Sequence, residues 1–170
     1  QAFPFKVSTA ASPVIAGDMI YCSAGYGVGA GLYKISRKGT RLSSSELWRK
    51  KNDMFNHWST PLYHDGHLYG MFSFKKYGNG PLQCVELRSG KIKWSQDGYG
   101  PGNVILSGDY LIALADDGVL SLVKATPSKY TELARKKVLD GKCWSTPILS
   151  NGLVFARSTS EAVCLDAGKH

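Results

Sequence analysis

The sequence predicts an all-β fold made of repeated antiparallel sheets, and two observations carry this prediction. First, one phrase recurs: Ser or Thr with Pro, a few apolar residues, a turn of Gly, Asp or Asn, and an apolar, aromatic run. Second, the chain is rich in turn residues, with 19 Gly among 170 residues, and has no apolar run near the roughly 18 residues of a membrane span. The phrase begins at Ser12, Thr60 and Thr146, with a degenerate copy at Gly102.

The spacing of the copies specifies the architecture. Taking Pro13, Pro61, Asn103 and Pro147 as equivalent, the copies lie 48, 42 and 44 residues apart. A β-propeller blade repeats about every 40 to 45 residues and consists of four antiparallel strands. We therefore expect a single β-propeller domain over residues 1–170 with about four blades. The repeats are expected at 9–51, 57–95, 99–140 and 143–170.

Turn residues divide each repeat into strands. In the second repeat, Asp65 and Gly66 tolerate positive φ at both turn positions, which favours a tight hairpin between the first two strands. The first two repeats predict strands at 13–16, 19–24, 31–36 and 45–50, and at 62–64, 67–69, 82–87 and 92–95. The third and fourth predict strands at 103–106, 109–114, 119–124 and 134–139, and at 147–150, 153–157 and 161–165.

Two features depart from a simple repeat. Thr126 and Pro127 can cap and begin a helix, and apolar residues follow at helical spacing up to Ala134, so a short helix is expected in the third repeat. The fourth repeat shows no fourth strand, while residues 1–8 form an extra apolar segment before the first repeat. We expect this segment to supply the closing outer strand of the last blade, because it would cover an open sheet edge.

The number of blades leaves three ways to close a ring. The four blades can form a ring within one chain, or two chains can join head to tail as eight blades. As a third option, the chain can be one half of a longer eight-bladed protein. The sequence does not choose among them.

Charge and cysteine usage exclude several classes of site. The formal charge of +8 comes from short Lys and Arg runs on expected outer strands and loop tips, which indicates a solvated basic rim, with a polyanion or anionic membrane as the alternative partner. No recognised nucleic-acid module accompanies the charge. Four cysteines without CxxC spacing favour free, mostly buried thiols over a disulfide framework or a zinc site. They are Cys22, Cys84, Cys143 and Cys164.

The segment from Cys84 to Trp94 resembles the repeat signature Ala-x-Asp-x-x-Thr-Gly-Lys-x-x-Trp of the pyrroloquinoline-quinone-type propellers. Gly90, Lys91 and Trp94 match it outright, and a shortened echo begins at Cys164. The resemblance implies that the tryptophan packs between neighbouring blades and that the Thr-Gly turn makes a corner, so the signature is a folding device. Many members bind no quinone. The chain looks most like the uncharacterised exported members, which implies a periplasmic or secreted location, although its first residues lack a signal peptide.

A quinone-dependent dehydrogenase of this family would show adjacent cysteines, a calcium set of Glu, Asn and Asp on inner loops, and an Asp as general base. The sequence has no Cys-Cys pair. Asn103 opens an inner strand, but Ser and Thr occupy the matching places in the other repeats. We therefore expect no cofactor and lean against an enzyme. Pyrroloquinoline quinone with calcium belongs to the alternative, in which the missing residues lie on another chain or another half.

Two further patterns resemble chemical sites without meeting their requirements. The glycine-rich stretch 25–31 lacks GxGxxG spacing and a following helix, so it indicates a flexible hairpin rather than a phosphate site. His64 and His67 face each other across a turn, but stable zinc sites use three or four ligands. No metal site is expected.

The connections between blades offer the best candidate binding surface. In a propeller they converge around the axis with the loops that join each second and third strand, and aromatic rings at such a mouth favour ligand binding. The alternative is that Trp58 and Trp144 merely pack between blades. The candidate rim residues are Tyr26, His57, Trp58, Tyr77, Tyr99, Asn103 and Trp144.

The sequence thus predicts a non-catalytic β-propeller module, a scaffold that recognises a protein, peptide or glycan at this loop face. Part of a quinone-dependent dehydrogenase is the first alternative. A self-assembling structural repeat unit, for example one that associates into an eight-bladed ring, is the second. Neither a nucleic-acid partner nor a transmembrane segment is expected.

Overall fold

The computed structural model describes residues 10–51, 53–72 and 80–168, and every regular element in these ranges is a β-strand. The strands form four antiparallel sheets, three with four strands and one with three, and within each sheet neighbouring strands follow one another in the chain. These sheets are the blades of a β-propeller and are called blades 1 to 4 in sequence order. The predicted fold class is confirmed.

The strand bounds of the four blades are as follows. Blade 1 consists of β1 (Val14–Ala16), β2 (Met19–Ala24), β3 (Gly29–Lys38) and β4 (Arg41–Lys50). Blade 2 consists of β5 (Leu62–His64), β6 (His67–Met71), β7 (Leu82–Glu86) and β8 (Lys91–Gln96). Blade 3 consists of β9 (Asn103–Ser107), β10 (Tyr110–Leu114), β11 (Val119–Lys124) and β12 (Glu132–Lys137). Blade 4 consists of β13 (Ile148–Ser150), β14 (Leu153–Arg157) and β15 (Ala162–Asp166).

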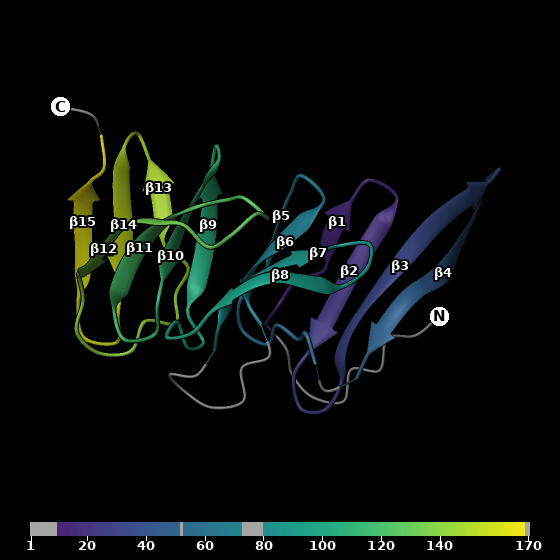
Figure 1. Cartoon of the computed structure of the whole chain (residues 1–170), viewed down its shortest axis with the longest axis horizontal. Coiled ribbons are helices and arrows are strands. Elements are labelled where there is room, and N and C mark those ends of the chain that lie inside the picture. Colours follow the sequence, from purple (N-terminus) through teal and green to yellow (C-terminus); the bar gives the residue numbers. More distant parts are fainter. Residues whose placement is uncertain (1–9, 52, 73–79, 169–170) are drawn as a thin grey trace.

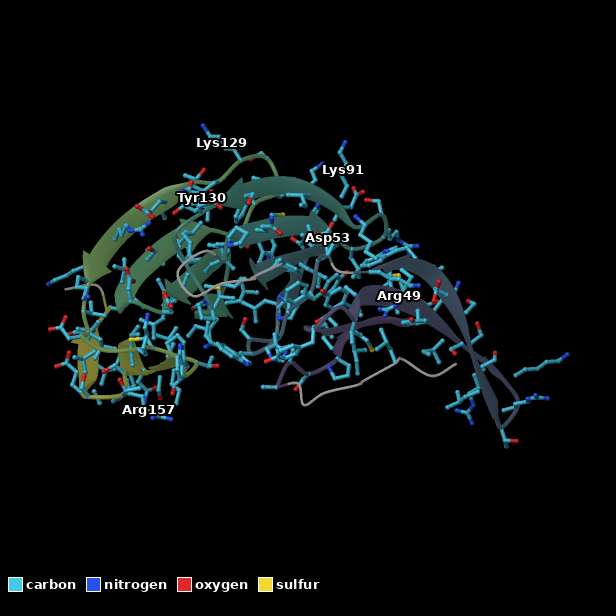
Figure 2. The ribbon with its side chains drawn as sticks, turned by 90° about the horizontal axis from the view of Figure 1, so that it is seen from below. Arg49, Asp53, Lys91, Lys129, Tyr130 and Arg157 are labelled. Carbon is cyan, nitrogen blue, oxygen red and sulfur yellow. The ribbon has the colours of Figure 1, made fainter. Side chains whose placement is uncertain are left out.

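The blades stand side by side along an arc, with blades 1 and 4 at its opposite ends (Figure 1). Figure 2 shows the same arc from below, with Lys91 and Tyr130 on its convex side. Blades 1 and 2, and blades 2 and 3, meet through their inner strands, because β1 contacts β5, and β9 contacts both β5 and β6. The described residues therefore form an open arc, and each end of it presents one face of a blade.

The tight hairpins follow the turn chemistry of the sequence. At the β5–β6 turn, Asp65 and Gly66 have φ values of 44° and 78°, the left-handed conformation that the sequence predicts for both positions. The ten-residue strands β3 and β4 run well past the predicted limits of 31–36 and 45–50 and form a long hairpin that reaches beyond the other blades (Figure 1). The other described strands match their predicted limits to within two residues.

The outer two strands carry the same irregularity in blades 1, 2 and 3. One residue of the fourth strand bulges out of register, and the pairs just before the shift are Leu32 with Trp48, Cys84 with Trp94, and Leu122 with Ala134. Because the bulge occurs at the same place each time, the three partners on the fourth strands occupy equivalent positions. These equivalent residues are Trp48, Trp94 and Ala134.

Aromatic pairs fill the junctions between blades 1 and 2 and between blades 2 and 3. In the first junction Tyr21 lies 6.1 Å from Trp48 between ring centroids, and the indole Nε1 donates to the Leu87 carbonyl at 2.9 Å. In the second, Tyr69 lies 6.0 Å from Trp94. Trp94 therefore packs between neighbouring blades, as the sequence resemblance implied.

The helix predicted in the third repeat does not form. The segment after Pro127 instead leads into β12, which pairs with β11, so Ala134 lies in a strand. The backbone before it is held by Trp94, whose Nε1 donates to the Thr126 carbonyl at 2.7 Å and whose ring lies 5.6 Å from Tyr130. These contacts with blade 2 outweigh the local helical spacing. The predicted closing strand at 1–8 lies outside the described residues and stays a prediction.

The cysteines are free thiols, in line with their spacing. Cys84 and Cys143 are buried, and burial raises the pKa of the Cys84 thiol to about 11. Cys22 is partly buried, whereas Cys164 is exposed on β15. Within the described ranges no helix is long and apolar enough to cross a membrane.

Candidate functional site

One face of the arc, called the loop face, collects the connections between blades and the loops that join second and third strands. Backbone hydrogen bonds tie these segments together across blades 2, 3 and 4. Asp116 donates its N–H to the Tyr99 carbonyl at 3.1 Å, and Cys143 donates to the Asp116 carbonyl at 3.0 Å. The predicted convergence of these segments on one face is therefore present.

Four of the predicted rim residues form a continuous aromatic row on the loop face. The ring of Tyr26 meets His57 edge-on with centroids 4.9 Å apart, His57 lies 5.6 Å from Trp58, and Trp58 lies 5.7 Å from Trp144. The ends of the row are open to solvent, with Tyr26 72% and Trp144 47% exposed. The aromatic row, defined as these four residues, spans connections from blades 1 to 4 and presents stacking surfaces at both ends.

The two indoles meet because the blade between them has no side chain at the matching place. Counting back three residues from Pro61, Asn103 and Pro147 gives Trp58, Gly100 and Trp144. Gly100 has a φ of 60°, and a Cβ there would overlap the carboxylate of Asp116. Glycine at this position makes room for the buried Asp116 carboxylate and places no side chain of its own between the indoles of blades 2 and 4, which are in contact.

His57 is the buried centre of the aromatic row. Its side chain is 8% exposed, and burial lowers the pKa of the imidazole, so the ring is neutral at pH 7. A Cβ at Gly25 would come within 3.0 Å of the His57 ring, so the glycine-rich hairpin leaves room for the imidazole. A neutral ring packs between Tyr26 and Trp58 without the energetic penalty of burying a charge.

Asn103 does not face the solvent and instead bonds to the connection that carries Trp144. It is buried, its Nδ2 donates to the Trp144 carbonyl at 2.9 Å, and its Oδ1 accepts from the Thr146 hydroxyl at 3.2 Å. Both bonds join blade 3 to the connection that carries Trp144. Asn103 is therefore a positioning residue for one end of the row.

The assignment of Tyr99 to the rim is wrong. Its ring is fully buried in the core between blades 2 and 3, where its hydroxyl lies 2.9 Å from that of Tyr130 and Arg135 stacks over its face. Tyr99 lies in the short connection between β8 and β9 and directly follows Gly98, which has a φ of 93°. Tyr77 lies outside the described residues.

Sequence reasoning missed an ion pair on the loop face. Asp116, in the loop between β10 and β11, is 2% exposed, and its Oδ2 lies 3.4 Å from Nζ of Lys142 in the connection to blade 4. The sequence signal is the Asp-Asp-Gly turn directly after an apolar strand. The pair fixes this connection next to the one carrying Tyr99 and so helps to position Trp144.

The histidine pair at the β5–β6 turn forms separate contacts. His64 Nε2 lies 3.4 Å from Asp109 of blade 3, whereas His67 Nδ1 lies 2.7 Å from the Asp65 carbonyl. In the described part of the chain, no group of three or more His, Cys, Asp or Glu side chains is placed to hold a metal ion.

Comparisons with known proteins support the fold. No protein-family model matches the chain, and no curated protein matches it. The structure is similar to BamB from Moraxella catarrhalis, with a TM-score of 0.58 and 14% identity over 91% of this chain and 41% of that one. It is also similar to AztD from Citrobacter koseri in its apo form, with a TM-score of 0.52 and 15% identity over 94% of this chain and 44% of that one.

A computationally designed protein, Ika4, has a TM-score of 0.63 and 10% identity to the chain and matches it over 99% of both lengths. The chain thus spans less than half of BamB and AztD but nearly all of Ika4. At these identities, the similarity concerns the β-propeller fold alone.

Proposed function

We propose that the protein is a non-catalytic binding module that recognises a segment of a partner protein, a peptide or a glycan on its loop face. The observation that carries this proposal is the aromatic row. It offers exposed rings at Tyr26 and Trp144 that are held in place by a buried neutral imidazole and by Asn103. Pre-positioned rings of this kind bind apolar side chains or the faces of sugar rings with little loss of side-chain freedom.

Removing the two indoles is expected to weaken binding at the loop face. We would select ligands for the wild-type protein from a displayed random-peptide library and a glycan array. We would then measure their affinity for the double variant Trp58→Ala, Trp144→Ala. Because aromatic anchors dominate binding energy at interfaces, Kd should rise by at least about tenfold.

The matched control is Tyr110→Ala. Tyr110 is 44% exposed and lies beside the β9–β10 turn, at the opposite end of the blade from the loop face. This variant should bind the selected ligands as the wild type does. Selected ligands that bind the double variant with unchanged affinity, or a selection that enriches none, would show that the aromatic row is not the binding surface.

Self-association is a second candidate function, favoured by the two ends of the arc. At the blade 4 end, Ile148, Phe155 and Cys164 pair across β13, β14 and β15 and so share one face, on which Phe155 is 41% exposed. In the internal junctions the equivalent face is covered by the next blade. At the blade 1 end, Ile15 is 70% exposed. It lies on the face of its sheet opposite to Tyr21, which lies in the first junction.

Each copy of the chain therefore offers both halves of a blade junction, and two copies joined head to tail would bury both ends. The blade 4 face corresponds to the one that carries Tyr69 in the second junction, and the blade 1 face to the one that carries Leu68. The chain matches 41% of BamB and 44% of AztD, which fits a unit about half the size of those chains, whereas it matches 99% of Ika4.

Under this second candidate, light scattering should give the wild-type protein twice the mass of one chain, and Phe155→Asp should give the mass of one. A charge on the blade 4 face would have to be buried unpaired in the junction. Cys164 should also react with a thiol reagent more slowly in the wild type than in this variant. As a control, Leu42→Asp, which changes a residue that is 68% exposed on the long hairpin, should leave the mass doubled. A wild-type protein with the mass of one chain at every concentration would rule this candidate out.

A further inference from the structure

The junction between blades 3 and 4 contains a cavity of about 480 Å³ that opens to solvent, and two of its lining residues, Ala134 and Ala167, are exposed. Strands β10, β11 and β12 of blade 3 form one wall, and β14 and β15 of blade 4 form the other. A second cavity of about 440 Å³ adjoins it and shares Ile112, Leu122 and Ala167 with it. Most of the side chains that line the larger cavity are aliphatic, among them Leu120, Val154 and Leu165.

The strand register explains why this junction is hollow. In the first two junctions, a tyrosine on the second strand and a tryptophan on the fourth flank one residue of the third strand, as in Tyr21, Leu32 and Trp48. In blade 3 the same three places are taken by Ile112, Leu122 and Ala134. Both rings of the aromatic pair are therefore replaced by smaller side chains, and both replacements line the cavity.

The hydrogen-bond acceptor for the missing indole has an equivalent in blade 4. In the first junction the Trp48 Nε1 donates to the carbonyl of Leu87, whose own N–H is bonded to the Gly66 carbonyl. In blade 4, the residue whose N–H is bonded to the matching turn glycine, Gly152, is Ala167. Ala167 also lines the cavity, so by this equivalence its carbonyl corresponds to the Leu87 carbonyl that accepts from the Trp48 indole.

We propose that this cavity binds a free bicyclic aromatic molecule of the indole class, seated where the first two junctions hold their own tryptophan. The ring would lie between Ile112, Leu122 and Ala134 of blade 3 and the aliphatic side chains of blade 4. Its N–H would donate to the Ala167 carbonyl. The volume lies within the range of about 300 to 1,000 Å³ that small-molecule sites have, and walls from two sheets supply apolar contacts for the two faces of such a ligand.

This site is separate from the aromatic row. It lies among strands of blades 3 and 4, whereas the row lies in the connections on the loop face. Lys136 and Asp166 also line the cavity and are exposed, so a polar substituent of the ligand could reach water beside them.

The direct test is a titration of the whole chain with indole, followed by NMR of the methyl groups. The methyl signals of Ile112, Leu122 and Val154 should shift together and give one Kd. Indene has the shape of indole but no N–H, and we expect it to bind about five times more weakly, the effect of one neutral hydrogen bond. No saturable shift of these methyl signals with indole would overturn the proposal, as would binding of N-acetyltryptophanamide without binding of free indole.

Filling the cavity supplies the matched variants. Ala134→Trp restores the residue type found at the equivalent place in blades 1 and 2, so it should raise the melting temperature and raise the Kd for indole by more than about tenfold. Ala134→Ser adds one small atom and should bind indole as the wild type does. Ile112→Tyr restores the other ring and provides a second filled variant should Ala134→Trp fail to fold. Indole affinity that is unchanged in a folded filled variant would place the ligand elsewhere and overturn the proposal.

Discussion

Replacing Trp94 with alanine is expected to lower the free energy of unfolding by about 3 to 5 kcal/mol, the usual range for a buried tryptophan. The side chain is 8% exposed, its ring contacts Tyr69 and Tyr130, and its Nε1 donates to the Thr126 carbonyl of blade 3. The substitution removes both the packing and the hydrogen bond that join blades 2 and 3. It would give the second junction the alanine that the third junction already has.

Urea unfolding followed by circular dichroism measures this effect. The matched control is Trp144→Ala, which removes the same side chain from a position that is 47% exposed, and we expect a loss below about 1 kcal/mol. If both variants lose the same free energy of unfolding, the contacts of Trp94 between blades 2 and 3 stabilise the fold no more than those of the partly exposed Trp144.

Replacing Asn56 with alanine is expected to lower the free energy of unfolding by about 2 to 4 kcal/mol, because it leaves buried polar groups without partners. Asn56 is fully buried between blades 1 and 2. Its Oδ1 accepts from the Tyr21 hydroxyl at 2.8 Å, and its Nδ2 donates to the Met71 carbonyl at 2.8 Å. One amide thus joins the second strand of one blade to the second strand of the next.

A double-mutant cycle with Tyr21→Phe separates this contact from general disruption. The Tyr21 hydroxyl oxygen also lies 2.6 Å from the Met54 carbonyl oxygen, so its single hydrogen is shared between two acceptors, and the phenylalanine variant alone should cost about 1 to 2 kcal/mol. If the amide and the hydroxyl stabilise each other, the double variant loses less than the sum of the single variants. Strict additivity, measured by the same urea unfolding, would contradict a direct coupling between the two side chains.

The sequence was sufficient for the architecture because each blade is bounded by turn residues with specific backbone requirements. Asp65 and Gly66 require φ values that few other residues adopt, so the hairpin could be predicted locally. The segment up to Ala134 was predicted as a helix because helical spacing is a local signal in the sequence. Its real conformation depends on pairing with β11 and on contact with Trp94, and no local signal reports these. The length of the β3–β4 hairpin was underestimated because its outer half is exposed and so lacks an alternating apolar pattern.

The candidate site could be predicted only in part, for a similar reason. The aromatic row was accessible because tryptophan at the same place in two repeats is visible in an alignment of the repeats. The inward turn of Tyr99 and the role of Asn103 depend on contacts with other blades, so no local pattern reports them. The cavity at Ala134 was not predicted because the equivalence of Ala134 with Trp48 and Trp94 becomes visible only once the strands and their bulges are paired.

The contact between Trp58 and Trp144 joins two blades that are not neighbours, and the equivalent position in the blade between them is Gly100, which has no side chain. Two indoles with centroids 5.7 Å apart couple their electronic transitions, and that coupling depends steeply on separation and tilt. The exciton coupling between these two indoles therefore depends on the curvature of the arc. Any event that bends or flattens the arc at blade 3 would change the exciton signal of this pair, without an added label.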